Sequence, residues 1–110
     1  MVNVDRVRIK ELMEREQKLF LKEHPRSKAL FKRAKRSLLA GVPMNWMVRW
    51  AGPYPIFVRD GKGAYITDVD GNKYLDLCLG DTGSMFGHSP KAVVDAVSKQ
   101  IKKGLSLIHI

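Results

Sequence analysis

Cysteine is almost absent from this sequence: Cys78 is the only one among 110 residues. A single cysteine excludes an internal disulfide framework and any metal site built from several cysteines. No apolar run approaches the roughly 18 residues that a membrane-spanning helix needs. The first residues lack the apolar stretch of a secretion signal and are too acidic for a transit peptide. We therefore expect a cytoplasmic protein that has no membrane partner.

Acidic residues are also scarce, with 11 Asp and Glu against 20 Lys and Arg, a formal net charge of +9. Most of this excess lies in residues 1–40. A nucleic-acid-binding module would place base-reading aromatic residues among such charges. The two aromatic residues there, Phe20 and Phe31, fall at apolar helical positions. Solvated helix faces are the preferred interpretation, and a small basic nucleic-acid-binding module is the alternative.

Apolar periodicity predicts two helices in residues 1–40. The first is expected to end at His24-Pro25, because the residue before a proline avoids helical geometry. Ser27 is expected to cap the second helix, and Gly41 with Pro43 to end it. The apolar stripes of both helices are narrow, so both need other structure to pack against.

Residues 41–55 are rich in tryptophan, methionine and proline and contain a single charge, Arg49. Such a segment is loop-like but too apolar to be left in water. One interpretation is a loop packed over a core or a neighbouring subunit. The other is the wall of a ligand site in which Arg49 is the only cation.

Residues 56–77 alternate between apolar and polar side chains, which predicts a three-stranded antiparallel meander. The expected strands are residues 56–59, 64–69 and 72–77. Asp70-Gly71 is a two-residue hairpin turn of the kind that requires positive φ.

A glycine-rich connection over residues 80–88 precedes the last predicted helix, and its spacing matches no dinucleotide or Walker loop. Ser89 is expected to cap this helix with Pro90 in its first turn, and Gly104 to close it. The buried face is expected to comprise Val93, Val94, Val97 and Ile101. Residues 105–110 follow this stop signal and are interpreted as a non-native tail, with an edge strand as the alternative.

Spacing alone assembles no catalytic or metal site. The three histidines are scattered, and neither Cys78 nor His88 has a third partner that the spacing reveals. Cys78 falls in a strand pattern, which favours a packed thiol. Asp68, Asp70 and Asp76 are interpreted as turn and strand-edge residues.

A resemblance is more specific than these patterns. The order of motifs is Val48-Arg49, Gly63-Ala64-Tyr65-Ile66, Asp68-Val69-Asp70-Gly71-Asn72, Tyr74-Leu75-Asp76 and Gly87-His88. In this order the chain resembles the N-terminal part of a class III pyridoxal-phosphate-dependent aminotransferase. Within that class it is most similar to the glutamate-1-semialdehyde 2,1-aminomutase-like branch.

The resemblance implies an α/β fold-type I enzyme of which this chain is a truncated N-terminal piece, inactive by itself. Residues 1–40 would form a helical arm, and residues 41–104 the first part of the small domain. The cofactor would be pyridoxal 5'-phosphate, held by a lysine outside these residues. The complete enzyme would be a homodimer that has no nucleic-acid partner. It would transfer an amino group between an amino acid or amine and an oxo acid, or perform 2,1-aminomutase chemistry.

No residue of this chain is expected to be catalytic or to bind the cofactor, but two are implied to bind substrate. Arg49 matches an arginine that faces the substrate carboxylate in that branch, a task that suits a guanidinium fork. Thr82 falls near an active-site aromatic residue of the family. The loop around Thr82 is one residue short, and Gly87-His88-Ser89-Pro90 stands where the branch usually has a second histidine. These departures leave open a transaminase that acts on another amino acid or amine.

Overall fold

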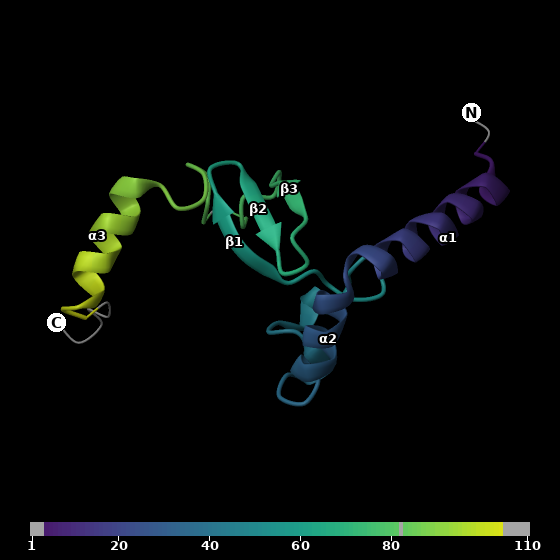
Figure 1. Ribbon diagram of the computed structural model, residues 1–110, viewed down its shortest axis with the longest axis horizontal. Coiled ribbons are helices and arrows are strands. Elements are labelled where there is room, and N and C mark those ends of the chain that lie inside the picture. Colours follow the sequence, from purple (N-terminus) through teal and green to yellow (C-terminus); the bar gives the residue numbers. More distant parts are fainter. Residues whose placement is uncertain (1–3, 82, 105–110) are drawn as a thin grey trace. The chain divides into compact units, whose positions relative to one another are not determined.

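The computed structural model describes residues 4–81 and 83–104, and in this part of the chain it contains three α-helices and one three-stranded sheet (Figure 1). The combination of helices and strands confirms the predicted fold class. Two compact units are present. The first comprises the chain up to Phe57 together with Asp68–Asn72, and the second comprises Val58–Thr67 together with the chain from Lys73 onward. The predicted tail, residues 105–110, lies outside the described residues, and the predicted division at residue 40 stays a prediction.

Helix α1 (Arg6–Glu23) ends where the His24-Pro25 pair predicts. Asp5 begins the helix, since its Oδ1 accepts a hydrogen bond from the Arg8 N–H at 2.9 Å. This is an ordinary local N-cap, which satisfies one of the N–H groups that the first helical turn leaves without a partner.

Helix α2 (Pro25–Ala34) begins before the predicted cap. Pro25 fits the first turn because its missing N–H would have had no helical partner there. Ser27 therefore lies inside the helix and is fully buried, and its predicted role as the cap is wrong. The helix also ends earlier than Gly41, which follows in a short 3₁₀ turn, η1 (Leu39–Gly41), at φ 78°.

Aromatic side chains form the core of the first unit. Tyr54 is buried, and its ring centroid lies 5.1 Å from that of Phe20 and 6.3 Å from that of Phe31. The Tyr54 hydroxyl donates a hydrogen bond to the His24 carbonyl oxygen at 3.1 Å. These contacts tie both helices to the segment of residues 41–55. Part of that segment therefore packs over a core, as one of its two interpretations predicts.

The sheet has the order β1 (Val58–Lys62), β2 (Tyr65–Asp68), β3 (Lys73–Leu75), and β2 pairs antiparallel with β3. The predicted meander is confirmed, with one correction to its first turn. Residues 60–62 continue β1, so only Gly63, at φ 59°, and Ala64 are left to turn the chain. Glycine reaches this left-handed conformation without steric cost.

Helix α3 (Lys91–Ile101) follows Pro90, its N-cap residue, and has no side-chain cap. Ser89 adopts φ 53° and donates its hydroxyl to the Gly61 carbonyl oxygen at 2.9 Å, so its predicted role as the cap is wrong. An N-cap residue needs extended backbone, which Pro90 supplies at ψ 129°.

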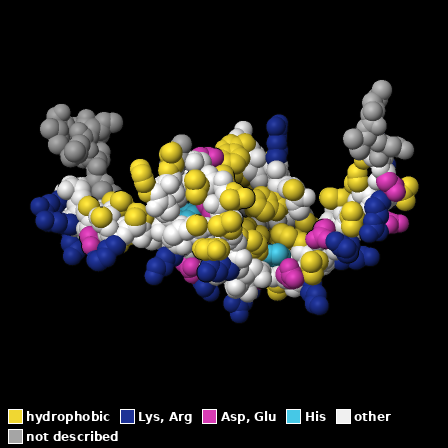
Figure 2. All heavy atoms as spheres, turned by 90° about the horizontal axis from the view of Figure 1, so that it is seen from above, with side chains coloured by type: hydrophobic (Ala, Val, Ile, Leu, Met, Phe, Trp, Pro, Cys, Tyr) yellow, Lys and Arg dark blue, Asp and Glu magenta, His cyan; other side chains and the backbone are white. Residues whose placement is uncertain are grey.

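The apolar face of α3 is open to solvent. Val93, Val94, Val97 and Ile101 are between 44% and 57% exposed. The predicted stripe is present, but its predicted burial is wrong, because no described element of this unit covers it. Figure 2 shows hydrophobic side chains at the surface of the face in view.

Candidate functional site

Arg49, the first predicted substrate-binding residue, directly follows the 3₁₀ helix η2 (Asn45–Val48). Its backbone N–H donates to the Trp46 carbonyl oxygen at 3.1 Å, which fixes the main chain at this point. The side chain is exposed, and within residues 4–81 and 83–104 its guanidinium makes no hydrogen bond or ion pair. A guanidinium in this state can present two parallel N–H groups to a carboxylate. Its role in binding substrate stays a prediction.

Thr82, the second predicted residue, lies outside the described part of the chain. The structure therefore does not test whether Arg49 and Thr82 act together. Each remains a candidate that rests on the resemblance.

A polar cluster that sequence reasoning missed lies in the first unit. Asp70, in the turn between β2 and β3, accepts hydrogen bonds from the Arg26 N–H at 2.6 Å, the Ser27 N–H at 2.9 Å and the Ser27 hydroxyl at 2.7 Å. These N–H groups belong to the first turn of α2, where a carboxylate also meets the positive end of the helix dipole. Asp70 therefore caps a helix that precedes it by more than 40 residues.

The pKa of Asp70 reflects this position. Burial raises it, but the hydrogen bonds from the Ser27 hydroxyl and from the backbone of Arg26 and Ser27 outweigh burial, so the pKa lies below its ordinary value. The carboxylate is therefore held in its charged form, which is the form that caps the helix.

Buried polar groups continue the cluster behind Asp70. The Asp68 carboxylate accepts from the Asn72 backbone N–H at 2.8 Å and from the Asn72 side-chain amide at 3.0 Å. His24 Nε2 lies 3.5 Å from Asp68 Oδ2, and the amide of Asn72 also donates to the Glu23 carbonyl oxygen at 3.2 Å. The Asp-Val-Asp-Gly-Asn motif thus joins a hairpin turn to the junction between α1 and α2.

A second polar network lies at the end of β3. Asp76 Oδ2 lies 2.6 Å from His88 Nε2, and Ser84 Oγ lies 3.2 Å from His88 Nδ1. Asp76 Oδ1 accepts from the backbone N–H groups of Cys78 and Leu79, both at 2.9 Å. The hydrogen bond from His88, followed by that from Leu79, lowers the pKa of Asp76 below its ordinary value.

This network corrects two expectations. His88 has an acidic partner that no spacing pattern revealed, because the loop brings Asp76 and His88 together although they are 12 positions apart in the sequence. Cys78 is exposed and lies beyond β3, so the prediction of a packed thiol is wrong. The available signal for Asp76 was its position at a strand end before glycine-rich chain, where aspartate often binds nearby backbone N–H groups.

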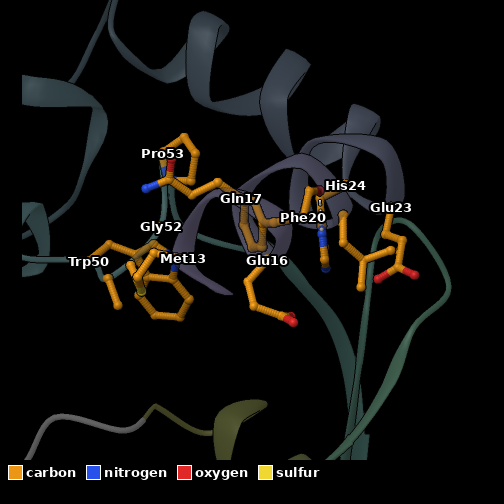
Figure 3. A pocket seen from close by; sticks show the side chains of 11 residues that line it. Met13, Glu16, Gln17, Phe20, Glu23, His24, Trp50, Gly52 and Pro53 are labelled. Atoms are coloured by element: carbon orange, nitrogen blue, oxygen red, sulfur yellow. Dashed lines mark hydrogen bonds between the residues drawn. The ribbon is translucent and has the colours of Figure 1, made fainter. Parts of the chain in front are cut away.

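A cavity of about 380 Å³ in the first unit lies between α1 and the segment around Trp50 (Figure 3). Its walls are mainly apolar, including Met13 and Phe20, and Glu16 and Glu23 are its acidic residues. No lysine or arginine lines it, so it does not suit an anionic group. No described helix is long and apolar enough to cross a membrane, and residues 4–81 and 83–104 hold no cluster of three potential metal ligands.

Comparison with known proteins identifies the class. Residues 46–110 match the family model Aminotransferase class-III. The chain is 46% identical over 79 residues to glutamate-1-semialdehyde 2,1-aminomutase of Methanocaldococcus jannaschii, a stretch that is 72% of this chain and 18% of that relative. The fold and the matched residues thus place the chain in the class-III aminotransferase family, to which it belongs.

Two solved structures are also similar to this chain. A glutamate-1-semialdehyde-aminomutase from Pseudomonas aeruginosa PAO1 is similar with a TM-score of 0.89 and 39% identity, covering 99% of this chain and 24% of that one. A β-phenylalanine aminotransferase from Variovorax paradoxus is similar with a TM-score of 0.79 and 25% identity, covering 93% and 23%. The chain thus spans about a fifth to a quarter of the length of these relatives.

Proposed function

We propose that the whole protein is a pyridoxal-phosphate-dependent enzyme of amino-group transfer, with 2,1-aminomutase chemistry on glutamate 1-semialdehyde as its first candidate reaction. The similarity to aminomutases in both sequence and structure carries this proposal. The P. aeruginosa enzyme has also been solved in complex with PMP, which supports a cofactor of this class. We propose a cytoplasmic homodimer as the working form. The comparisons lend no support to the nucleic-acid alternative.

The described residues do not form a site for pyridoxal phosphate. The cavity beside Trp50 presents glutamates where a phosphate needs donors or cations. The groove along α2 offers Lys28, Lys32 and Lys35 but no aspartate for the pyridine nitrogen. When bound, the cofactor would supply the electron sink for the chemistry. We assign no step at the cofactor to these residues.

Arg49 is proposed to bind the substrate carboxylate. Glutamate 1-semialdehyde has one carboxylate, because an aldehyde replaces the other carboxyl group of glutamate. The exposed guanidinium of Arg49 can hold this group through two parallel hydrogen bonds, which would orient the substrate as well as bind it. Thr82 is proposed as a second substrate contact.

A transaminase is the second candidate function. The similarity to the β-phenylalanine aminotransferase favours it, because that enzyme shares the fold of this segment without being named a mutase. The two candidates differ in where the amino group ends: on another carbon of the same molecule, or on a separate oxo acid.

The deciding experiment follows a ¹⁵N-labelled amino group in the whole protein loaded with pyridoxal phosphate. Migration from carbon 2 to carbon 1 of glutamate 1-semialdehyde supports the mutase, and label appearing on an added oxo acid supports the transaminase. A protein that binds the cofactor and moves the label in neither assay, over a panel of amino donors, contradicts the proposal.

The role of Arg49 is tested in the same assay. Arg49→Ala should raise KM for the carboxylate substrate by about 10- to 100-fold, since a hydrogen-bonded charge contributes roughly 1.5 to 3 kcal/mol. Arg49→Lys keeps the charge and loses the fork, so it should recover only part of this loss. The matched control is Arg59→Ala, which removes another exposed arginine whose partner is the neighbouring Asp60. Equal KM values in all three variants contradict the assignment.

A further inference from the structure

One face of α1 carries side chains at a regular spacing. Its members follow one another at alternating intervals of three and four positions: Arg6, Ile9, Met13, Glu16, Phe20 and Glu23. This average spacing is close to one helical turn, so all six lie on one narrow stripe of the helix. It is also the spacing at which two helices pack side by side. We call these six residues the α1 seam.

The two halves of the α1 seam have different surroundings. In the first half every residue from position 6 to position 11 is exposed, and the Ile9 side chain is 48% exposed. The second half lines the cavity of about 380 Å³, together with Trp50 from the segment of residues 41–55 (Figure 3). The seam therefore has an uncovered apolar side chain near one end and an open apolar cavity near the other.

The charges of the α1 seam are also divided between its ends. Arg6 stands at the first end and Glu23 at the last, and within residues 4–81 and 83–104 neither side chain forms an ion pair. The two lie about 25 Å apart along the helix, so they cannot pair with each other in one copy. The cavity has acidic residues and no lysine or arginine, so it suits a basic segment that carries an apolar side chain. The first end of α1 is such a segment.

An antiparallel pair of α1 helices brings these complementary ends together. When a two-fold axis passes close to Met13, Arg6 lies opposite Glu23 of the second copy. In the same register Ile9 lies opposite Phe20 of the second copy, which is a wall of the cavity. Because a two-fold interface repeats every contact, both charge pairs and both apolar contacts form twice.

We propose that the α1 seam is an interface with a second copy of this chain, in which the two α1 helices pack antiparallel and Ile9 of each enters the cavity beside Trp50 of the other. This inference rests on the proposed homodimer and names one of its contacts. The two Glu16 side chains approach each other near the axis. Each is already paired with its neighbour Arg15 at 2.7 Å, which offsets their repulsion.

A photo-cross-linking experiment on the whole protein tests the contact. Benzoylphenylalanine replaces Ile9, which is exposed and so tolerates a larger side chain. Irradiation should give a covalent dimer on a denaturing gel, linked at residues 19–24 or at Trp50 of the second copy. Residues 19–24 lie about 15 Å or more from Ile9 along the same helix, so this link cannot form within one helix. The matched control replaces Val7, which is 71% exposed on the opposite face of α1 and should not give this link.

Charge exchange tests the register of the two helices. Arg6→Glu or Glu23→Arg turns both symmetric charge pairs into repulsions and should lower the yield of the cross-link by about two- to tenfold, a modest effect because exposed ion pairs are weak. Both substitutions together restore opposite charges and should restore the yield. The matched control is Arg8→Glu, because Arg8 lies off the seam and its partner is Glu11 of the same helix at 3.2 Å.

The other outcomes overturn the inference. Ile9 linked to another part of the second copy, linked only within its own chain, or not linked at all shows that the second copy does not cover the seam in this way. A yield that stays low in the double charge variant rules out the proposed register. Sedimentation of the wild type separates this inference from the proposed function. A dimer without the expected link overturns the inference alone, whereas a monomer also overturns the proposed homodimer and leaves amino-group transfer to the labelling assay.

Discussion

Two aspartates, one for each compact unit, hold the backbone in the same chemical way over very different distances. Asp70 binds N–H groups of α2 more than 40 residues before it in the chain. Asp76 binds N–H groups only two and three residues after it. Both carboxylates have a lowered pKa, so both act as anions. The same residue type can therefore fix a long-range contact or a local loop. Which of the two it fixes depends on whether the N–H groups next to it belong to a distant helix or to the following residues.

The partners of the two aspartates also differ in burial. Ser27, which Asp70 binds through two groups, is 0% exposed, whereas Cys78, beside Asp76, is exposed. Water can replace Asp76 at an exposed N–H but cannot reach the buried groups around Ser27. A buried donor without a partner is destabilising, so the two sites should respond differently to mutation.

Asp70→Ala should have the largest effect on stability. It removes the cap of α2 and leaves buried donors of Ser27 without an acceptor, which should lower the free energy of unfolding by about 2 kcal/mol. Urea denaturation of the whole protein measures this loss. Asp70→Asn keeps one acceptor oxygen and should lose less. Equal stability of Asp70→Ala and the wild type would show that the cap contributes nothing.

Asp76→Ala should destabilise the protein less than Asp70→Ala and act mainly on one loop. The N–H of exposed Cys78 can turn to water, so the expected result is faster hydrogen exchange in residues 77–88 with a smaller change in the urea midpoint than for Asp70→Ala. Exchange that rises throughout both units would contradict the local role of Asp76.

Acid should weaken both aspartate sites. A carboxyl group whose pKa is lower in the folded than in the unfolded chain stabilises the fold above its unfolded pKa of about 3.9, and the stabilisation is lost as the pH falls through the folded pKa. The wild type should therefore lose stability below about pH 4. The double variant Asp70→Asn with Asp76→Asn should be less stable at pH 7 and lose less between pH 5 and pH 2. If the wild type and the double variant lose the same amount of stability between pH 5 and pH 2, this explanation is wrong.

Asp5→Ala should have the smallest effect. Asp5 caps α1 through one exposed local hydrogen bond, so its loss should cost about 0.5 kcal/mol. Urea denaturation of Asp5→Ala and Asp70→Ala under the same conditions compares the loss of a local cap with the loss of a long-range cap. Similar losses in the two variants would remove the distinction between them.

Local patterns in the sequence predict much of this fold, for physical reasons that can be named. Strand alternation and the Asp70-Gly71 turn predict the meander, because they depend on neighbouring residues alone. The start of α2 is not predictable in this way. Ser27 has the right chemistry for a cap, but its partner is Asp70, and no spacing rule connects two residues so far apart in the chain.

The candidate site is less predictable than the fold. Arg49 was found through resemblance, and its exposed position agrees with a binding role without establishing it. The link between Asp76 and His88 depends on the path of a loop with left-handed residues that are not glycine, and local preferences argue against such a path. Burial of the α3 face was predicted from its stripe, but a stripe indicates only that a helix needs a partner and does not supply one.

The cap on α2 has a consequence for the order of events during protein synthesis. A ribosome makes α2 well before it makes Asp70, so the nascent helix lacks its cap until the hairpin turn has left the exit tunnel. Contacts between distant parts of a chain form more slowly than local ones, because a longer loop must close. The first unit therefore completes its fold only after residues 58–67 of the second unit have been made, and until then the first turn of α2 has no partner at Asp70.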